Sequence, residues 1–206
     1  MKEYPVITIS RQYGSGGREV GQLLAKRLGI PYYDNELITL AAEESGFAPE
    51  LFANADQNAS NSLLFSLSLY GTTSGTYNMP IGDRVFLIQS DIIRKVAQQG
   101  PCVIVGRCAD YVLHENPNCL SVFLRAPLDW RIEHAVTNYG LAREGAKEAI
   151  SRTDKKRSVY YQHFTGEKWG LSDTYHITVD TLSLIHISAI DFCGKERYSY
   201  NNREKP

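Results

Sequence analysis

Short apolar runs alternate along this chain with longer stretches whose apolar residues recur at intervals of three and four. The first run, VITI at residues 6–9, predicts a strand. Residues 19–28 then have the spacing of an amphipathic helix, which Gly29-Ile30-Pro31 ends. The runs PCVIVG, CLSVFLRAP and YHITVDT predict three further strands, the first of them short and apolar enough to be buried on both faces.

Helical spacing predicts the segments between these strands. YYDNELITLAAEESG gives a short extended piece and a helix that ends near Gly46, and residues 83–99 and 127–139 give two more. A charged helix, REGAKEAISRTDKKRSVYYQHF, precedes the YHITVDT strand, and LSLIHISAIDFC predicts a last helix. Residues 53–82, rich in Asn, Ser, Thr and Gly, predict a mobile, partly helical insertion.

Strands that alternate with helices predict an α/β fold in which a parallel sheet has helices on both faces. Ligands of such sheets bind beyond the carboxyl ends of the strands. The glycine-rich stretch SRQYGSGGREVG (residues 10–21), Gly106-Arg107, Arg125 and Asp180-Thr181 each follow a predicted strand. We therefore expect them at one edge of the sheet, called here the carboxyl edge.

Composition limits the classes of function. Of the 206 residues, 43% are hydrophobic and 22% are charged, which suits one folded domain with an insertion. The formal net charge of −1 gives no support to nucleic-acid binding, so any anion site must be local. The four cysteines form no CxxC pair, and no segment has the ~18 apolar residues of a membrane span. These features predict a cytoplasmic protein with reduced thiols and no membrane partner; they do not indicate an oligomeric state.

Residues 12–17, called here the glycine loop, lie between the first predicted strand and helix. Glycines allow backbone N–H groups to approach an anion, and the following helix adds its positive end. The loop departs from the phosphate-binding pattern GxxxxGK[ST]. If Gly16 is the last glycine of that pattern, Ser10 or Arg11 stands where the first belongs, Gly17 replaces the lysine and Arg18 replaces the Ser/Thr. The alternative is a structural turn without a ligand.

A displaced arginine is the candidate for the missing positive charge. Arg18 follows the lysine position directly, its planar guanidinium suits phosphate, and Arg11 is a second cation near the loop. The lost hydroxyl normally helps to hold Mg²⁺. Ser15 or Glu19 is the candidate to contribute to that metal, the latter directly or through water.

Four stretches, in order, resemble the cytidylate kinase-like family. VIVGRCADYVLHENPNCLSVFLRAPLDWRIEHA is similar to the part of those enzymes in which a strand ends in Gly-Arg-Asp and a second strand follows, and TDKKRSVYY resembles their lid. ITVDTLSLIHIS is similar to their late strand and turn, and YYDNELITLAA lies where they carry the acceptor-site turn. The resemblance covers roughly residues 4–193 and is to a branch whose loop reads GSGGRE.

The resemblance implies a three-layer P-loop kinase fold, with one domain over residues 1–193, a monophosphate-binding insertion at about 36–90, a lid at about 140–170 and a tail at 194–206. It implies transfer of the γ-phosphoryl group of ATP, with Mg²⁺, to CMP or a related small acceptor. The alternative is a protein on the same scaffold that binds nucleotides without catalysis, because the loop lysine and hydroxyl are missing.

Site residues follow from the same resemblance. The donor phosphates are expected at a run of six residues: Gly14, Ser15, Gly16, Gly17, Arg18 and Glu19. The acceptor nucleotide is expected at Asp34 and Arg107, with Cys108 at the position of the family's acceptor-binding aspartate. The lid residues expected over the acceptor and the transferring phosphate are Asp154 and Arg157, with Arg152 a weaker candidate.

Each of these residues also has a purely structural interpretation. RTDKKR can be a solvated helix face, Arg107 can cap the edge of the sheet, and Asp34 can cap the helix that follows it. Asp180-Thr181 suits a turn, and Cys108 suits a small buried filler.

Overall fold

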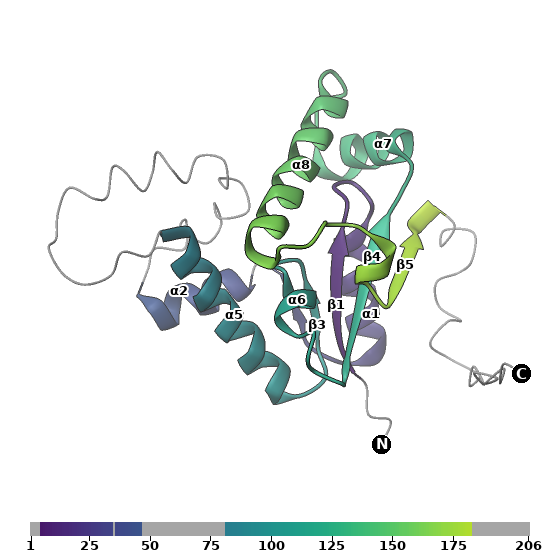
Figure 1. The fold of residues 1–206 in the computed structure, drawn as a ribbon. Helices are drawn as coiled ribbons and strands as arrows, with labels where there is room; N and C mark the ends of the chain where they lie inside the picture. The colour runs from purple at the N-terminus through teal and green to yellow at the C-terminus, as the bar shows by residue number, and fades with distance from the viewer. Residues whose placement is uncertain (1–4, 35, 47–80, 183–206) are drawn as a thin grey trace, which may run out of the picture.

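The structure is a computed structural model that describes residues 5–34, 36–46 and 81–182 (Figure 1). Most of the predicted insertion, the predicted helix after Leu182 and the tail at 194–206 lie outside the described residues.

Five described strands form one parallel sheet in the order β2-β3-β1-β4-β5. Their bounds are β1 Val6–Arg11, β2 Tyr32–Tyr33, β3 Val103–Val105, β4 Cys119–Arg125 and β5 Ile177–Asp180. The central strand β1 pairs Ile7 with Val103 on one side and with Leu120 on the other. Every strand predicted from an apolar run is present, and all the carboxyl ends lie at the same edge.

The predicted helices are also present within the described ranges. They are α1 Gly17–Leu28, α2 Glu36–Ser45, α5 Ile81–Gln99, α7 Leu128–Tyr139 and α8 Ala146–Thr165, with a short α6 Ala109–Val112 and a 3₁₀ turn Ser172–Thr174 that the spacing did not predict. Helix α1 starts two residues before the predicted Glu19. Its N-cap is Gly16, whose left-handed backbone (φ 75°) ends the loop and lets Gly17 enter the helix.

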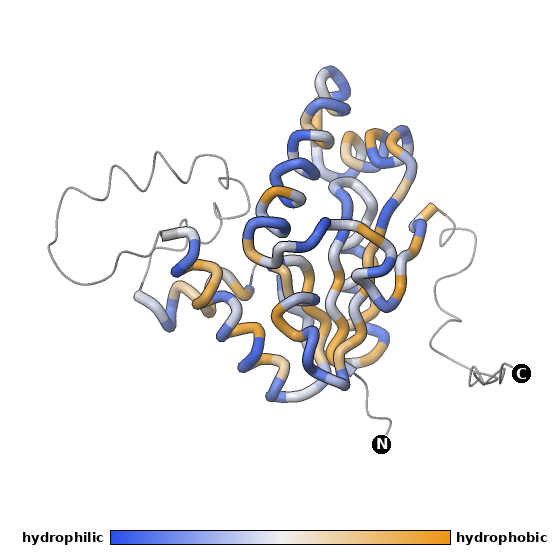
Figure 2. The backbone as a smooth tube through the Cα atoms, in the orientation of Figure 1, coloured by the Kyte–Doolittle hydropathy of each residue, from blue (hydrophilic) through white to orange (hydrophobic). Residues whose placement is uncertain are grey.

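Successive side chains of β1 point to opposite faces of the sheet, so the core has two layers. Ile7 and Ile9 pack with Ala25 of α1 on one face of the sheet. Val6 and, on the neighbouring strand, Ile104 pack on the other face in a cluster that includes residues of α2, α5 and α6. Figure 2 shows that the strands are largely hydrophobic, as expected for strands with helices on both faces.

Helices α7 and α8 lie beyond the carboxyl edge of the sheet (Figure 1). The carboxyl-terminal part of α8 is held by a cluster in which Tyr160 and Tyr161 are buried with Cys108, and Tyr160 contacts Phe86 of α5. This packing holds α8 across the end of the sheet where a ligand is expected. Among the helices of the described ranges, none combines the length and apolar character that a membrane span requires.

Candidate functional site

The glycine loop turns sharply from β1 into the first turn of α1. Gly14 and Gly16 have left-handed backbones (φ 79° and 75°), and the Ser15 N–H donates to the Gln12 carbonyl at 3.2 Å. Gly16 is the N-cap of α1 and has no side chain to bond the N–H groups of the first turn, so the positive end of the helix receives no bond from its cap residue. This is the backbone arrangement of an anion-binding turn.

Helix α7 packs directly against this loop. A Cβ atom at Gly14 would lie 2.7 Å from the backbone oxygen of Arg131, and the Arg131 guanidinium donates to the Tyr13 carbonyl at 3.3 Å. Gly14 is therefore required both by its φ and by the close approach of α7.

Helix α8 is tied to the same loop by two residues that the sequence analysis placed in a lid. The Asp154 carboxylate accepts the Tyr13 backbone N–H at 2.7 Å and is paired with Arg131 at 2.6 Å. Arg157 donates to the Arg11 carbonyl at 3.0 Å. Asp154 and Arg157 thus face the loop rather than solvent, whereas Arg152 is exposed. Whether Asp154 and Arg157 also reach a transferring phosphate stays a prediction.

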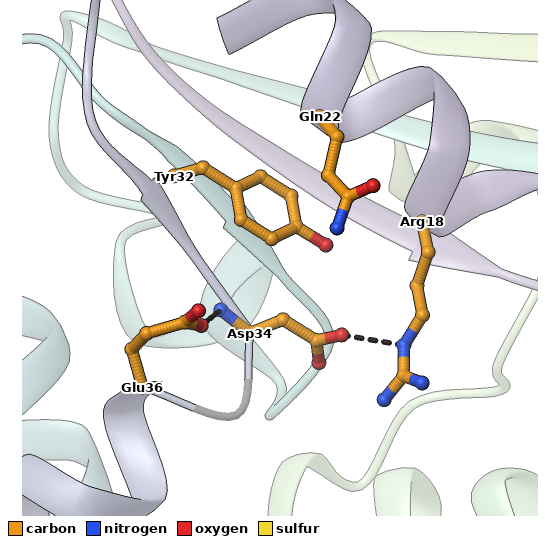
Figure 3. A pocket seen from close by; sticks show the side chains of 5 residues that line it. All are labelled: Arg18, Gln22, Tyr32, Asp34 and Glu36. Atoms are coloured by element: carbon orange, nitrogen blue, oxygen red, sulfur yellow. Dashed lines mark hydrogen bonds and ion pairs between the residues drawn. The ribbon is translucent and has the colours of Figure 1, made fainter.

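Arg18 and Asp34, predicted for the donor and the acceptor, meet each other (Figure 3). Arg18 Nε lies 2.5 Å from Asp34 Oδ2, and Arg11 approaches the same carboxylate at 3.9 Å. Partial burial lowers the pKa of Arg18, but the Asp34 carboxylate outweighs it, so the pKa lies above its ordinary value. The carboxylate contacts both arginines, and its part in capping the following helix stays a prediction.

A small polar cavity of about 110 Å³ adjoins this ion pair. Figure 3 shows the side chains that line it: Arg18, Gln22, Tyr32, Asp34 and Glu36. Partial burial and the neighbouring Asp34 charge raise the pKa of Tyr32, so its hydroxyl stays protonated. The volume of this cavity is below the ~300 Å³ typical of a site for a small organic ligand.

The turn after β3 carries the predicted acceptor residues. Gly106, Arg107 and Cys108 have three consecutive left-handed backbones, with φ of 76°, 59° and 53°. The Gly106 N–H donates to the Ile9 carbonyl at 2.9 Å, which fixes this turn beside the end of β1. Non-glycine residues in that region cost roughly 1–2 kcal/mol each. Arg107 and Cys108 are both buried, so the turn places Arg107 at the carboxyl edge, beside the end of β1.

Asp110 is a buried carboxylate that the sequence analysis did not select. It accepts hydrogen bonds from the Ser10 hydroxyl at 3.1 Å and the Tyr161 hydroxyl at 2.7 Å. Burial raises the pKa of Asp110 even though these two bonds oppose the shift. The resemblance drew attention to Cys108 because an aspartate was expected there; the chain instead has its aspartate two residues later, tied to β1 and α8.

Arg125 is the last residue of β4, and Asp180 is the last residue of β5, the neighbouring outer strand of the sheet. Thr181 follows directly after β5. Arg125 and Asp180 are 4.0 Å apart, and the Thr181 hydroxyl donates to the Arg125 carbonyl at 3.2 Å. The Asp180 side chain accepts the Leu182 N–H. Thr181 and Leu182 are helical, so these contacts join the end of β5 to the start of a helix rather than to the turn considered from the sequence.

The described residues contain no group of three or more His, Cys, Asp or Glu side chains placed to hold a metal ion. The Ser15 hydroxyl is fully buried and donates to the Gln12 carbonyl at 2.9 Å, and the Glu19 carboxylate accepts the Tyr139 hydroxyl at 3.1 Å. Their part in binding Mg²⁺ stays a prediction. Magnesium at such a site is bound mainly through substrate phosphates and water, so it would enter as the Mg–ATP complex.

The comparisons with known proteins agree with this architecture. A cytidylate kinase from Methanopyrus kandleri is 24% identical over 185 residues, which span 85% of this chain and 84% of that protein. An uncharacterized protein from Eubacterium ventriosum ATCC 27560 has a similar crystal structure, with a TM-score of 0.62 and 27% identity over 91% of this chain and 99% of that one. The model of the cytidylate kinase-like family matches residues 6–183. The resemblance noted in the sequence and the P-loop kinase fold are therefore confirmed, and the chain belongs to the cytidylate kinase-like family.

Proposed function

We propose that this protein transfers the γ-phosphoryl group of ATP to a nucleoside monophosphate of the CMP type or to another small acceptor that carries a phosphate. Membership of the family supports nucleotide phosphotransfer in general, and the similarity to the Methanopyrus kandleri cytidylate kinase supports a cytidine acceptor. The observation that carries the proposal is the glycine loop, whose left-handed Gly14 and Gly16 lead into an α1 terminus without a side-chain cap.

Phosphoryl transfer depends on alignment and on positive charge around the transferred group. In the proposed reaction the loop amides and the first turn of α1 bind the donor phosphates of Mg–ATP. Arg107, held at the carboxyl edge by the turn after β3, binds the acceptor. Helix α8 covers this edge and excludes water, which would otherwise compete as the acceptor.

Binding without catalysis is the second candidate function. It is favoured by one observation, the glycine at the lysine position, since loss of a positively charged donor to the transition state costs about a hundredfold or more in rate. In addition, Arg18, the neighbouring cation, is engaged by the Asp34 carboxylate at 2.5 Å.

Incubation with Mg–ATP and a panel of monophosphates separates the two. CMP, dCMP, UMP, AMP and GMP are each added, and release of ADP is followed against a reaction without acceptor. A kinase gives acceptor-dependent ADP, and the order of kcat/KM identifies the acceptor. ATP binding in calorimetry with no acceptor-dependent ADP supports the non-catalytic function. A ligand at a hundred times its Kd adds about 2.7 kcal/mol to stability, so an unchanged melting temperature with both nucleotides rejects both functions.

A further inference from the structure

Two positions at the ends of the glycine loop, one directly before it and one at its last residue, are exchanged relative to the phosphate-binding pattern GxxxxGK[ST]. With Gly16 as the last glycine of the pattern, Arg11 stands at the first glycine and Gly17 stands at the lysine. The chain therefore has a cation where the pattern has no side chain, and no side chain where the pattern has a cation.

The structure places these two positions in contact. A Cβ atom at Gly17 would lie 2.6 Å from Arg11 Cβ and 2.7 Å from Arg11 Cγ, closer than non-bonded carbon atoms come. Gly17 is the first residue of α1, and its φ is not in the left-handed region that favours glycine. Its backbone would accept a side chain, so the stem of Arg11 is what excludes one.

The guanidinium of Arg11 continues from this point across the carboxyl edge. Its Nη1 fills the space where Gly106 would carry a Cβ, with Cζ at 3.1 Å from that position. The side chain is only 12% exposed, and its guanidinium forms an ion pair with the Asp34 carboxylate at 3.9 Å. Arg11 thus crosses the start of α1 and places its charge between the glycine loop and the turn that holds Arg107.

Local charge also favours this position for a phosphate. The Asp34 carboxylate is shared by two arginines, with Arg18 at 2.5 Å and Arg11 at 3.9 Å. Arg11, Arg18 and Asp34 together have one net positive charge, which is the charge that a loop lysine supplies. A guanidinium also offers paired donors that match two phosphate oxygens.

We propose that Arg11, not Arg18, takes the place of the loop lysine and binds the donor phosphates, and that Gly17 is glycine in order to admit the Arg11 side chain. This inference rests on the proposed binding of ATP at the glycine loop. It assigns the phosphate-binding cation to the end of β1, a rigid strand in the centre of the sheet.

Variants at the two positions test the exchange. Arg11→Met keeps an aliphatic stem but removes the guanidinium, and we expect it to lower ATP affinity at least tenfold and kcat/KM about a hundredfold. Arg11→Gly should lose as much, and the double variant Arg11→Gly/Gly17→Lys, which restores the ordinary pattern, should regain at least tenfold over Arg11→Gly. Arg27→Gln is the matched control, because it removes an exposed arginine from the far end of α1 and should change neither quantity.

Thermal melting tests the geometry without any ligand. Gly17→Ala alone should lower Tm by about 4 °C or more, because its Cβ meets Arg11, whereas Gly17→Ala should cost little in the Arg11→Gly background. Equal effects in the two backgrounds would overturn the contact between the positions.

The outcomes separate this inference from the proposed function. Wild-type protein that binds no ATP rejects the proposed function and this inference together. Wild-type protein that binds ATP while Arg11→Met binds it equally rejects Arg11 as the cation and leaves the proposed function intact. If Arg11→Gly does not fold, as judged by circular dichroism, Arg11→Met alone decides.

Discussion

Replacement of Asp154 by alanine should detach α8 from the glycine loop at a large cost in stability. The carboxylate accepts the Tyr13 backbone N–H at 2.7 Å and pairs with Arg131 at 2.6 Å, so one side chain joins the loop, α7 and α8. Asp154→Ala leaves the Arg131 guanidinium, which is only 11% exposed, without this carboxylate.

The magnitude follows from the burial of this pair. Loss of one partner of a buried ion pair costs 3–5 kcal/mol, and Asp154, at 17% exposed, belongs near the lower limit. We therefore expect a loss of about 3 kcal/mol in the free energy of unfolding. For a chain of this size that corresponds to roughly 6–12 °C in Tm. Asp154→Asn keeps an acceptor for one of the two donors and should lose about half as much.

Urea unfolding followed by circular dichroism, together with thermal melting, measures these changes. Glu133→Ala is the control, because Glu133 binds Arg143 through two short hydrogen bonds of the same kind but on the exposed surface. Its removal should leave Tm nearly unchanged, since exposed pairs contribute little. If Asp154→Ala proves as stable as Glu133→Ala, the three-way contact does not hold α8 to the loop.

Three other changes test separate features. Gly14→Ala and Gly29→Ala both place a side chain at a left-handed residue, but only Gly14 faces a backbone oxygen at 2.7 Å, so Gly29→Ala should cost about 1 kcal/mol and Gly14→Ala clearly more; equal losses in urea unfolding would contradict this. Burial raises the pKa of Asp110 in the folded state, so the stability of wild type relative to Asp110→Asn should rise as pH falls from neutrality towards the unfolded-state pKa near 4. A difference that is flat or falls over this range, in unfolding curves taken at each pH, would refute the raised pKa. Burial, together with the nearby Cys119, raises the pKa of Cys102 to about 11, so iodoacetamide at pH 8 should label Cys102 only as fast as the protein opens; peptide mapping that shows immediate labelling would count against its burial.

The fold could be predicted because the apolar runs, the helical spacing and the helix-ending glycine all indicated the same structure. Apolar runs bounded by turns gave strands, helical spacing gave the helices between them, and Gly29 marked the end of α1 as it stands in the structure. Helix α6 was missed because four residues are too few to establish a period. The start of α1 was placed late because a glycine at its first position carries no helix signal.

The sequence could predict which residues belong to the candidate site, but not which groups they contact. Asp154 and Arg157 were predicted from the resemblance to the family's lid, and the structure brings Asp154 to the glycine loop and Arg157 to the end of β1 directly before it. Their partners there are backbone groups of Tyr13 and Arg11, and spacing along one helix carries no information about which backbone groups of a distant segment it meets. Arg18 was favoured because it is adjacent in sequence to the lysine position, yet a helix turns about 100° per residue, and its side chain leaves in the direction of Asp34.

In the proposed exchange of positions, the replacement charge comes from a residue that is distant from the lysine position in sequence. In a tight turn, residues six apart can contact each other, so a missing charge is replaced from wherever a side chain can enter the same space. A glycine that starts a helix without a left-handed backbone is explained when another side chain fills the space above it. Gly17 is that residue here, and Arg11, six positions earlier at the end of the central strand, is the side chain that fills it.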